Sequence, residues 1–226
     1  MSTQYDPQQV ELMQERIIVV DDEDRVIRSG SKEECHINRG DDEILLHRAF
    51  SVFLFDPSTN KLLLQQRASS KITFPDYWAN TCCSHPLYCE EEMDTANFVG
   101  VKRAAIRKLK HELGITGLKV EDFYFLNTIH YHAPGEGGWG EHEVDHVLGV
   151  AAKDVNLDHV SPNEVQATKW FSQSELETFL SQQPKLGGKI SPWFQKMAQN
   201  PHLLPRWWSS LGQMTNDAKD LTIYKL

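Results

Sequence analysis

The sequence has no long apolar run, few cysteines and no excess of positive charge, and each of these features excludes a class of protein. No stretch of the 226 residues approaches the roughly 18 consecutive apolar residues of a membrane-spanning helix, so we expect no membrane partner. Four cysteines, two of them adjacent, do not resemble the framework of a disulfide-stapled secreted domain. The formal net charge of −9 argues against nucleic-acid partners, although a local basic cluster could still hold a small anion.

The ends of the sequence carry no strong targeting signal. The first residues have neither a basic start nor an apolar run, so we expect no signal peptide and a reducing, cytoplasmic environment. The final Tyr224-Lys225-Leu226 is similar to the Ser-Lys-Leu peroxisomal signal, but Tyr is a poor first residue for it. A peroxisomal location is therefore a second expectation.

Length and composition favour one globular domain. Hydrophobic residues make up 40% and charged residues 24%, which is typical of a soluble protein with a sizeable core. No internal repeat, low-complexity tract or linker divides the chain. We expect a single domain over residues 1–226, with a core at about 45–180 on which segments 1–44 and 181–226 pack.

The pattern of apolar and turn residues predicts a mixed sheet flanked by helices. Strands are expected at residues 17–20, 25–28, 45–55, 61–66, 123–131, 143–151 and 165–171. Helices are expected at residues 6–16, at 101–113 where apolar residues recur until Gly114, and from Ser172 and Ser191. Residues 90–97 are expected to connect, and Trp207 and Trp208 to anchor the C-terminal segment. Strands and helices do not alternate regularly, which indicates an α+β fold.

Residues 80–86, Asn-Thr-Cys-Cys-Ser-His-Pro, place two thiols and an imidazole within four positions. Adjacent residues of a strand point to opposite faces, so only one thiol can face a given pocket. Cys83 shares parity with His85, whereas Cys82 does not. We therefore predict that Cys83 is an acid/base or nucleophile, that His85 is a metal ligand on the same side and that Cys82 faces away. The alternative is a core cysteine beside a turn histidine.

Imidazoles and carboxylates elsewhere in the chain have the types that bind a divalent ion. In a strand, Glu141 and Glu143 face one side and His142 the other. Two neighbouring carboxylates repel unless a cation lies between them or one is protonated. Buried, they indicate a metal site; at an edge, they are only solvated charge. One candidate set that suits Mn²⁺ or Zn²⁺ is His36, His47, His85, Glu141 and Glu143, although ten histidines permit many other combinations.

A group of cationic residues could cradle a diphosphate. Its members, each expected near a loop, are Lys32, Arg67, Lys71 and Lys108. Glu112 lies one helical turn after Lys108 and could hold Mg²⁺ against the phosphates. The simpler interpretation of that pair is a surface salt bridge.

Residues 107–115, Arg-Lys-Leu-Lys-His-Glu-Leu-Gly-Ile, resemble a degenerate Nudix box. The positions that match its usual core, R-E-U-x-E-E-x-G-U, are Arg107, Leu109, Glu112, Gly114 and Ile115. Lys108 and His111 replace two carboxylates that a Nudix hydrolase uses to collect metals and activate water. This degeneracy, together with the motifs at 46–51, 80–86 and 139–143, is similar to the type I isopentenyl-diphosphate isomerases, over about residues 32–208.

The resemblance implies a Nudix-type α/β/α sandwich and a monomer that interconverts isopentenyl and dimethylallyl diphosphate in isoprenoid, including sterol, biosynthesis. It implies Mg²⁺ on the diphosphate, held by Glu112, and one Mn²⁺, Zn²⁺ or Mg²⁺ at the His/Glu set. Cys83 would be one acid/base, and Glu143, helped by Tyr131, the other, on the opposite face of the substrate. Trp193 would stabilise the cation. The family has Arg where this chain has Lys108, so that phosphate contact would be monodentate.

The double-bond shift needs one proton delivered and another removed two carbons away, through a tertiary carbocation. Either Cys83 or Glu143 could donate first. The chief alternative is a Nudix hydrolase of a nucleoside diphosphate derivative, which the missing carboxylates disfavour. A thiol-protease-like role for Cys83 lacks any oxyanion-hole signal. A non-catalytic Nudix-like module would not need Cys83, Glu143 and the histidines together.

Overall fold

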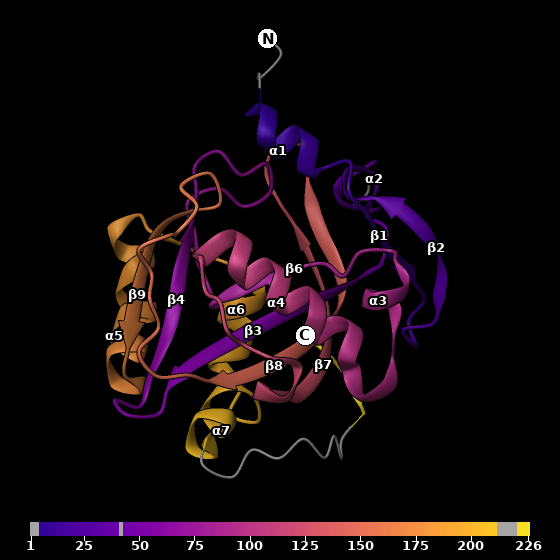
Figure 1. Cartoon of the computed structure of the whole chain (residues 1–226). Helices are drawn as coiled ribbons and strands as arrows, with labels where there is room; N and C mark the ends of the chain where they lie inside the picture. The colour runs from indigo at the N-terminus through magenta and orange to yellow at the C-terminus, as the bar shows by residue number, and fades with distance from the viewer. Residues whose placement is uncertain (1–4, 41–42, 212–220) are drawn as a thin grey trace.

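The computed structural model describes residues 5–40, 43–211 and 221–226 as one mixed sheet with helices on both faces (Figure 1). The strands are β1 Arg16–Val20, β2 Val26–Ser31, β3 His47–Asp56, β4 Lys61–Arg67, β5 Tyr77–Ala79, β6 Cys82–Ser84, β7 Phe123–Pro134, β8 Gly140–Ala151, β9 Val165–Phe171, β10 Lys189–Ile190 and β11 Ile223–Lys225. The helices are α1 Pro7–Leu12, α2 Lys32–His36, α3 Glu90–Met93, α4 Val99–Leu113, α5 Gln173–Gln182, α6 Pro192–Gln199 and α7 Leu204–Ser209, with 3-10 turns η1 Ala96–Phe98, η2 Val120–Asp122 and η3 Gln183–Leu186.

Strand β3 is the centre of the sheet. It pairs in parallel with β8 and antiparallel with the short β6, while β7 and then β11 continue the sheet beyond β8. Strands β3 and β4, which follow each other in sequence, pair only beside their turn, because β4 then diverges to pair with β9 and β5. The register places His47 of β3 beside Glu143 of β8 and Ser51 beside Cys83 of β6. Sheet order therefore gathers residues that are distant in sequence.

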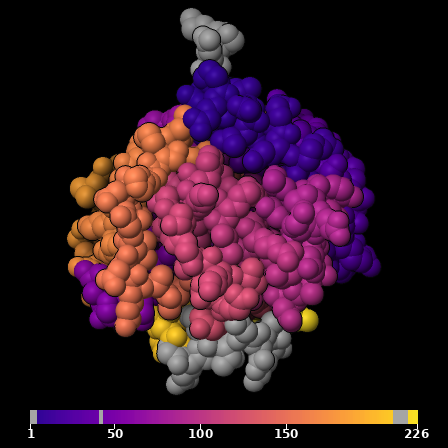
Figure 2. All heavy atoms as spheres, in the orientation of Figure 1, coloured from indigo at the N-terminus to yellow at the C-terminus, as the bar shows by residue number. Residues whose placement is uncertain are grey.

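The face of the sheet under α4 forms one half of the core. Alternate residues of β3 point to opposite faces, so Phe50 and Val52 contact this helix side. The predicted apolar stripe of α4 supplies Leu109 and Leu113, which are fully buried against them. In Figure 2 the surface of this side is formed by α4 and its neighbours, with the N-terminal segment along one edge.

The opposite face of the sheet is covered by α6 and α7. Phe53 and Phe55 of β3 pack there against Phe194 and against the two tryptophans of α7. Trp207 donates its indole N–H to Asn127, and Trp208 donates to Asn60. The two-sided core establishes the α/β/α sandwich, and the predicted tryptophan anchor is confirmed.

The capping residues explain where several helices begin. Asp6 accepts hydrogen bonds from the backbone of Gln8 and Gln9 at the start of α1, which ends at Leu12, earlier than expected. Ser172 and Glu175 form the predicted capping box of α5. Residues 90–97, expected to be only a connection, contain α3 and most of η1; three acidic residues fill the first turn of α3, where the helix dipole favours them.

Gly114 ends α4 for a reason that a substitution can test. Its φ is +67°, and a Cβ there would lie 2.6 Å from the Cβ of His159 and 2.7 Å from its carbonyl oxygen. Gly114→Ala therefore combines left-handed strain of about 1–3 kcal/mol with a backbone clash. Gly117 has φ +87° with no atom within 4 Å, so Gly117→Ala carries only the strain. We expect Gly114→Ala to lower the free energy of unfolding more than Gly117→Ala in chemical denaturation; equal losses would contradict the close approach.

Candidate active site

Three imidazoles converge at one end of the sheet. His36 ends α2, His47 begins β3 and His85 follows β6, and all three are buried. Their ring centroids are 4.6 to 4.9 Å apart. One ligand atom from each of these rings and one from Glu143 all lie within 4.8 Å of one another.

The hydrogen bonds of this cluster orient the rings as metal ligands. Nδ1 of His36 lies 2.7 Å from the carbonyl of Lys32, and Nδ1 of His47 lies 2.8 Å from the carbonyl of Leu45. A carbonyl only accepts, so each Nδ1 carries the proton and each Nε2 offers a lone pair. Neither Nε2 has a hydrogen-bond partner although both are buried. Backbone-held imidazoles with unpartnered nitrogens fit a divalent metal ion.

Burial keeps the rings of His36 and His85 neutral. It lowers the pKa of His36 well below its usual value, with the neighbouring imidazoles acting in the same direction. Burial also lowers the pKa of His85 to about 3, although Glu143 opposes the shift. Neutral imidazole is the form that binds a metal, so the site is competent at neutral pH.

The carboxylate of Glu143 is shared between the histidines and a tyrosine. Its Oε1 lies 2.9 Å from Nε2 of His85 and 3.5 Å from Nε2 of His47, and its Oε2 accepts a 2.5 Å hydrogen bond from the hydroxyl of Tyr131. Burial acts to raise the pKa of Glu143, but the contacts of its carboxylate with His47 and His85 outweigh burial and lower the pKa. Glu143 is therefore ionised.

Glu141 lies next to this group and is held in a different state. It accepts from the same Tyr131 hydroxyl at 3.0 Å but is not among the four residues whose ligand atoms lie within 4.8 Å. Burial, and then the charge of Glu143, raise the pKa of Glu141 to about 7. The two carboxylates are both buried, which excludes the interpretation as solvated edge charge.

Asp145 extends the row of acids and was missed by the sequence analysis. It accepts a 2.7 Å hydrogen bond from Ser51, and its other oxygen is buried without a partner. Burial and the charge of Glu143 raise the pKa of Asp145 well above its usual value. The alternation that marked Glu141 and Glu143 continues to this position, so the same signal could have found it.

The two adjacent cysteines point to opposite faces, as their parity predicts. Cys83 lines a cavity with Glu141 and Glu143, and burial raises the pKa of its thiol, so the thiol form is present at rest. The Nη1 of Arg67 lies 3.7 Å from the Cys83 sulfur and opposes that shift. Cys82 lies on the other face, fully buried, with its sulfur 3.5 Å from Glu112. Cys82 is therefore a neighbour of Glu112, the carboxylate expected to hold Mg²⁺ on the diphosphate.

Arg67 lines the cavity, and Trp193 packs beside Arg67. Arg67 donates to the carbonyls of Thr73 and Phe74, and its guanidinium carbon lies 5.9 Å from the centre of the Trp193 ring. Trp193 is fully buried, donates its indole N–H to Asn80 and stacks with Tyr131 at 5.8 Å. In the sequence, Asn80 stands out only as part of the motif at residues 80–86.

A buried cluster of charge lies beside the cysteines. Lys108 and Glu112 are 3.3 Å apart and only 2% and 3% exposed, so the surface-salt-bridge interpretation of this pair is wrong. Gln65 donates to Glu112, and Lys71 pairs with Glu164 at 2.5 Å. Glu164 was missed because nothing near it in sequence marks it.

Lys32 completes the cationic group. It is 9% exposed and lies near Lys71 and Lys108. Burial, and then the charges of Lys71 and Lys108, lower the pKa of Lys32 to about 8. Three ammonium groups against two carboxylates leave an excess of positive charge, which would favour a bound anion.

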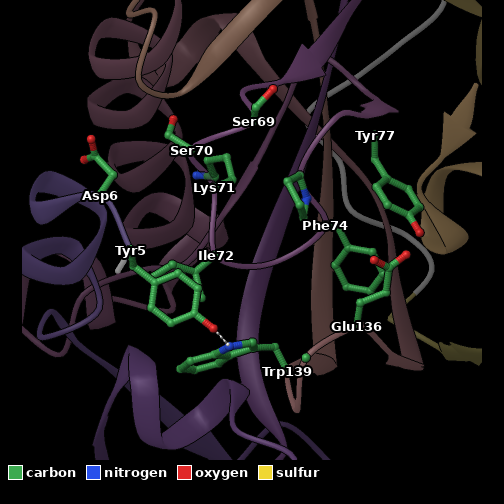
Figure 3. A pocket seen from close by; sticks show the side chains of 12 residues that line it. Tyr5, Asp6, Ser69, Ser70, Lys71, Ile72, Phe74, Tyr77, Glu136 and Trp139 are labelled. Atoms are coloured by element: carbon green, nitrogen blue, oxygen red, sulfur yellow. Dashed lines mark hydrogen bonds between the residues drawn. The ribbon is translucent and has the colours of Figure 1, made fainter. Parts of the chain in front are cut away.

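The cavity at the centre of the site is nearly closed. Its lining includes Lys32, Arg67, Cys83 and Glu143, and it leaves about 10 Å³ for the centre of a water molecule, the scale of one bound water. A larger cleft of about 440 Å³ adjoins it through Lys71 (Figure 3). Tyr5 and Trp139, joined by a 2.9 Å hydrogen bond, lie at one side of that cleft.

The fold and the sequence define a class. The NUDIX domain family model matches residues 45–194. A crystal structure of a NUDIX hydrolase from Alicyclobacillus acidocaldarius aligns with a TM-score of 0.50 at 10% identity, over 72% of this chain and 95% of that one, which shows the fold alone. The chain therefore belongs to the NUDIX family.

Curated relatives narrow the class. The isopentenyl-diphosphate delta-isomerase of Aspergillus fumigatus is 51% identical over 98% of this chain and 79% of the relative. Those of Schizosaccharomyces pombe and Bos taurus are 48% and 45% identical, over 92% of this chain and 89% and 91% of the relatives. Within the NUDIX family, this chain belongs to the isopentenyl-diphosphate isomerases.

The histidine cluster gives a prediction about metal content. We expect the purified protein to retain a divalent ion through dialysis, and His47→Ala to weaken its binding more than roughly tenfold, because a ligand is lost. Metal analysis by mass spectrometry after dialysis measures this. His202→Ala, at an exposed histidine, is the matched control. Equal retention by His47→Ala and the control would remove His47 from the ligand set.

Proposed function

We propose that this protein interconverts isopentenyl diphosphate and dimethylallyl diphosphate by protonation and deprotonation through a tertiary carbocation. The observation that carries the proposal is one nearly closed cavity lined by a thiol from β6 and a carboxylate from β8. Membership of the isomerase family supports the same reaction. The alternative, hydrolysis of a nucleoside diphosphate derivative, is not favoured, since Lys108 and His111 replace carboxylates that a hydrolase needs.

Cys83 and Glu143 are the proposed acid/base pair. Cys83 rests as a thiol and Glu143 as a carboxylate, so the pair holds one proton to give and one site to receive. Tyr131 donates its hydroxyl proton to Glu143 and orients that carboxylate. Trp193, which is fully buried beside Arg67 and Tyr131, would stabilise the cation with its aromatic ring.

Two groups of residues are proposed to hold metal and diphosphate. A divalent ion, Mn²⁺, Zn²⁺ or Mg²⁺, would be bound by His36, His47, His85 and Glu143, with Glu141 beside them, and would supply charge that positions the Glu143 carboxylate. Glu112 would hold Mg²⁺ on the diphosphate, and the cations that would bind the phosphate oxygens are Lys32, Arg67, Lys71 and Lys108. Arg67 uses several donors on residues 73–74, so its remaining contact would be single.

The chain is proposed to act as one domain and as a monomer. The hairpin of β1 and β2 pairs with β3, and α6 and α7 pack into the same core as the sheet. Both observations support the packing of segments 1–44 and 181–226 on residues 45–180. Among the described residues, no helix has the length and apolar character to cross a membrane. We propose a cytoplasmic location. A peroxisomal location would require Tyr224–Leu226 to leave the sheet, where Tyr224 and Lys225 pair with β7 and Leu226 donates to His130.

The reaction itself gives the first test. Purified protein incubated with isopentenyl diphosphate and Mg²⁺ should form the dimethylallyl isomer, followed by chromatography, without release of phosphate or pyrophosphate. Cys83→Ala should lose turnover by at least roughly a hundredfold, because general acid–base groups contribute on that order.

Cys89→Ala is the control for that variant, since Cys89 is half-buried and outside the cavity. Cys82→Ala is less suitable because the Cys82 sulfur contacts Glu112. Phosphate release without the isomer would favour the hydrolase, and full activity of Cys83→Ala would refute the role of the thiol.

The lowered pKa of Lys32 predicts a pH dependence. The ammonium is charged below about pH 8 and loses its proton as the pH rises through that value. Since a charged contact to phosphate is worth about 1.5–3 kcal/mol, we expect kcat/KM to fall roughly tenfold or more across this range. Lys32→Arg keeps its charge and should move the decline to higher pH. An unchanged profile in Lys32→Arg would contradict this role.

A further inference from the structure

The face of the β7–β8 hairpin that points away from the candidate active site carries three histidines. His130 and His132 lie two residues apart on β7, so their side chains share a face. His142 of β8 is directly opposite His132 in the register. Tyr131 and Glu143 alternate with them and point to the catalytic side. The three imidazoles therefore form a patch of their own.

The hydrogen bond between the rings of His130 and His142 leaves one buried ring nitrogen without a partner. Nδ1 of His142 lies 2.9 Å from the carbonyl of Ile44, so it carries a proton, and the neutral ring has a lone pair on Nε2. That Nε2 lies 2.9 Å from Nε2 of His130. If His130 donates there, its Nδ1 is left unprotonated, 3.6 Å from a carboxylate oxygen of Asp22. This Nδ1 is buried without a hydrogen-bond partner.

Moving the proton of His130 to Nδ1 changes this arrangement and creates a ligand pair. Nδ1 then donates toward Asp22, and the Nε2 lone pairs of His130 and His142 face each other at 2.9 Å. Two metal–nitrogen bonds of about 2.0–2.1 Å at angles of 90–110° need a separation of about 2.9–3.4 Å. We propose that His130 and His142, with His132, form a binding site for a divalent transition-metal ion of the Zn²⁺ class.

The surroundings of the pair have the features of a built ligand site. The second nitrogen of His142 lies 2.9 Å from the Ile44 carbonyl and that of His130 lies 3.6 Å from the Asp22 carboxylate, and carbonyls and carboxylates are the groups that orient metal-binding histidines. The ring of His132 is 5.0 Å from that of His142 and perpendicular to it, which makes His132 the neighbouring imidazole of the pair. His132 and His142 are both half-buried, which leaves a route from solvent.

The donor set selects the kind of ion. Imidazole nitrogens suit Zn²⁺, Cu²⁺, Ni²⁺ and Co²⁺, whereas Mg²⁺ requires oxygen ligands. Burial lowers the pKa of His130, although the charge of Asp22 opposes the shift, and the lowered pKa favours the neutral ligand form. The ammonium of Lys225 lies 4.0 Å from the same oxygen of Asp22 and also lowers that pKa. The site is thus distinct in position and chemistry from a Mg²⁺–diphosphate group.

The test measures binding and not turnover, so its outcome is separate from that of the proposed isomerase activity. His47→Ala weakens the front cluster, and Zn²⁺ is then added in equilibrium dialysis. We expect about one equivalent to remain bound in His47→Ala and in His47→Ala/His202→Gln, but not in His47→Ala/His130→Gln or His47→Ala/His132→Gln. In the otherwise unchanged protein, His130→Gln should reduce bound Zn²⁺ by one equivalent.

Asp22→Asn removes only the carboxylate behind His130 and should weaken Zn²⁺ binding about 10–100-fold without loss of folding. Substitution with Co²⁺ should give visible absorption bands in His47→Ala that disappear with His130→Gln. The proposal is overturned if His47→Ala binds no Zn²⁺, or if its bound Zn²⁺ is indifferent to His130→Gln and His132→Gln.

Discussion

The buried carboxylate of Glu143 is the constraint on which the rest of the site depends. An ionised group away from water must be compensated by partners with good geometry. Here the partners are His47, His85 and Tyr131, which belong to β3, to the segment after β6 and to β7. The sheet brings these three side chains to the Glu143 carboxylate because it places β7, β8, β3 and β6 side by side. The order of the strands therefore determines that the buried Glu143 carboxylate is ionised.

The local periodicities made much of this fold predictable. The four-residue repeat ending at Gly114 is α4, and the aromatic run at 45–55 is β3, in which successive residues serve two cores. The alternation of side chains in strands predicted that Cys83 and Cys82 separate and that Glu141 and Glu143 share a face. The histidines that join Cys83 and the two glutamates were selected by resemblance to a family. Ten histidines permit many combinations, and spacing alone does not choose among these combinations.

Other features depend on packing between distant segments. The Lys108–Glu112 pair has the spacing of a surface ion pair, and only the position of α4 over β4 and β6 makes it buried. Glu164 meets Lys71 across more than ninety positions of sequence, so no local pattern marks it. The partners of Arg67 follow from the path of residues 73–76, where Phe74 and Asp76 adopt positive φ without being glycine. Such pairings become visible only once the chain is folded.

The small volume of the central cavity has a consequence for the fate of the reaction. Hydrolases of this fold consume water, so their sites must admit it beside the phosphates. A tertiary cation can react in two ways: it loses a proton to a base and gives an alkene, or it adds water and gives an alcohol. The cavity among Cys83, Glu143 and the lysines has room for about one water, so a bound substrate tail that displaces this water would prevent its capture of the cation. The yield of the isomer over the alcohol would therefore depend on how closely the residues of the cavity pack around the bound cation.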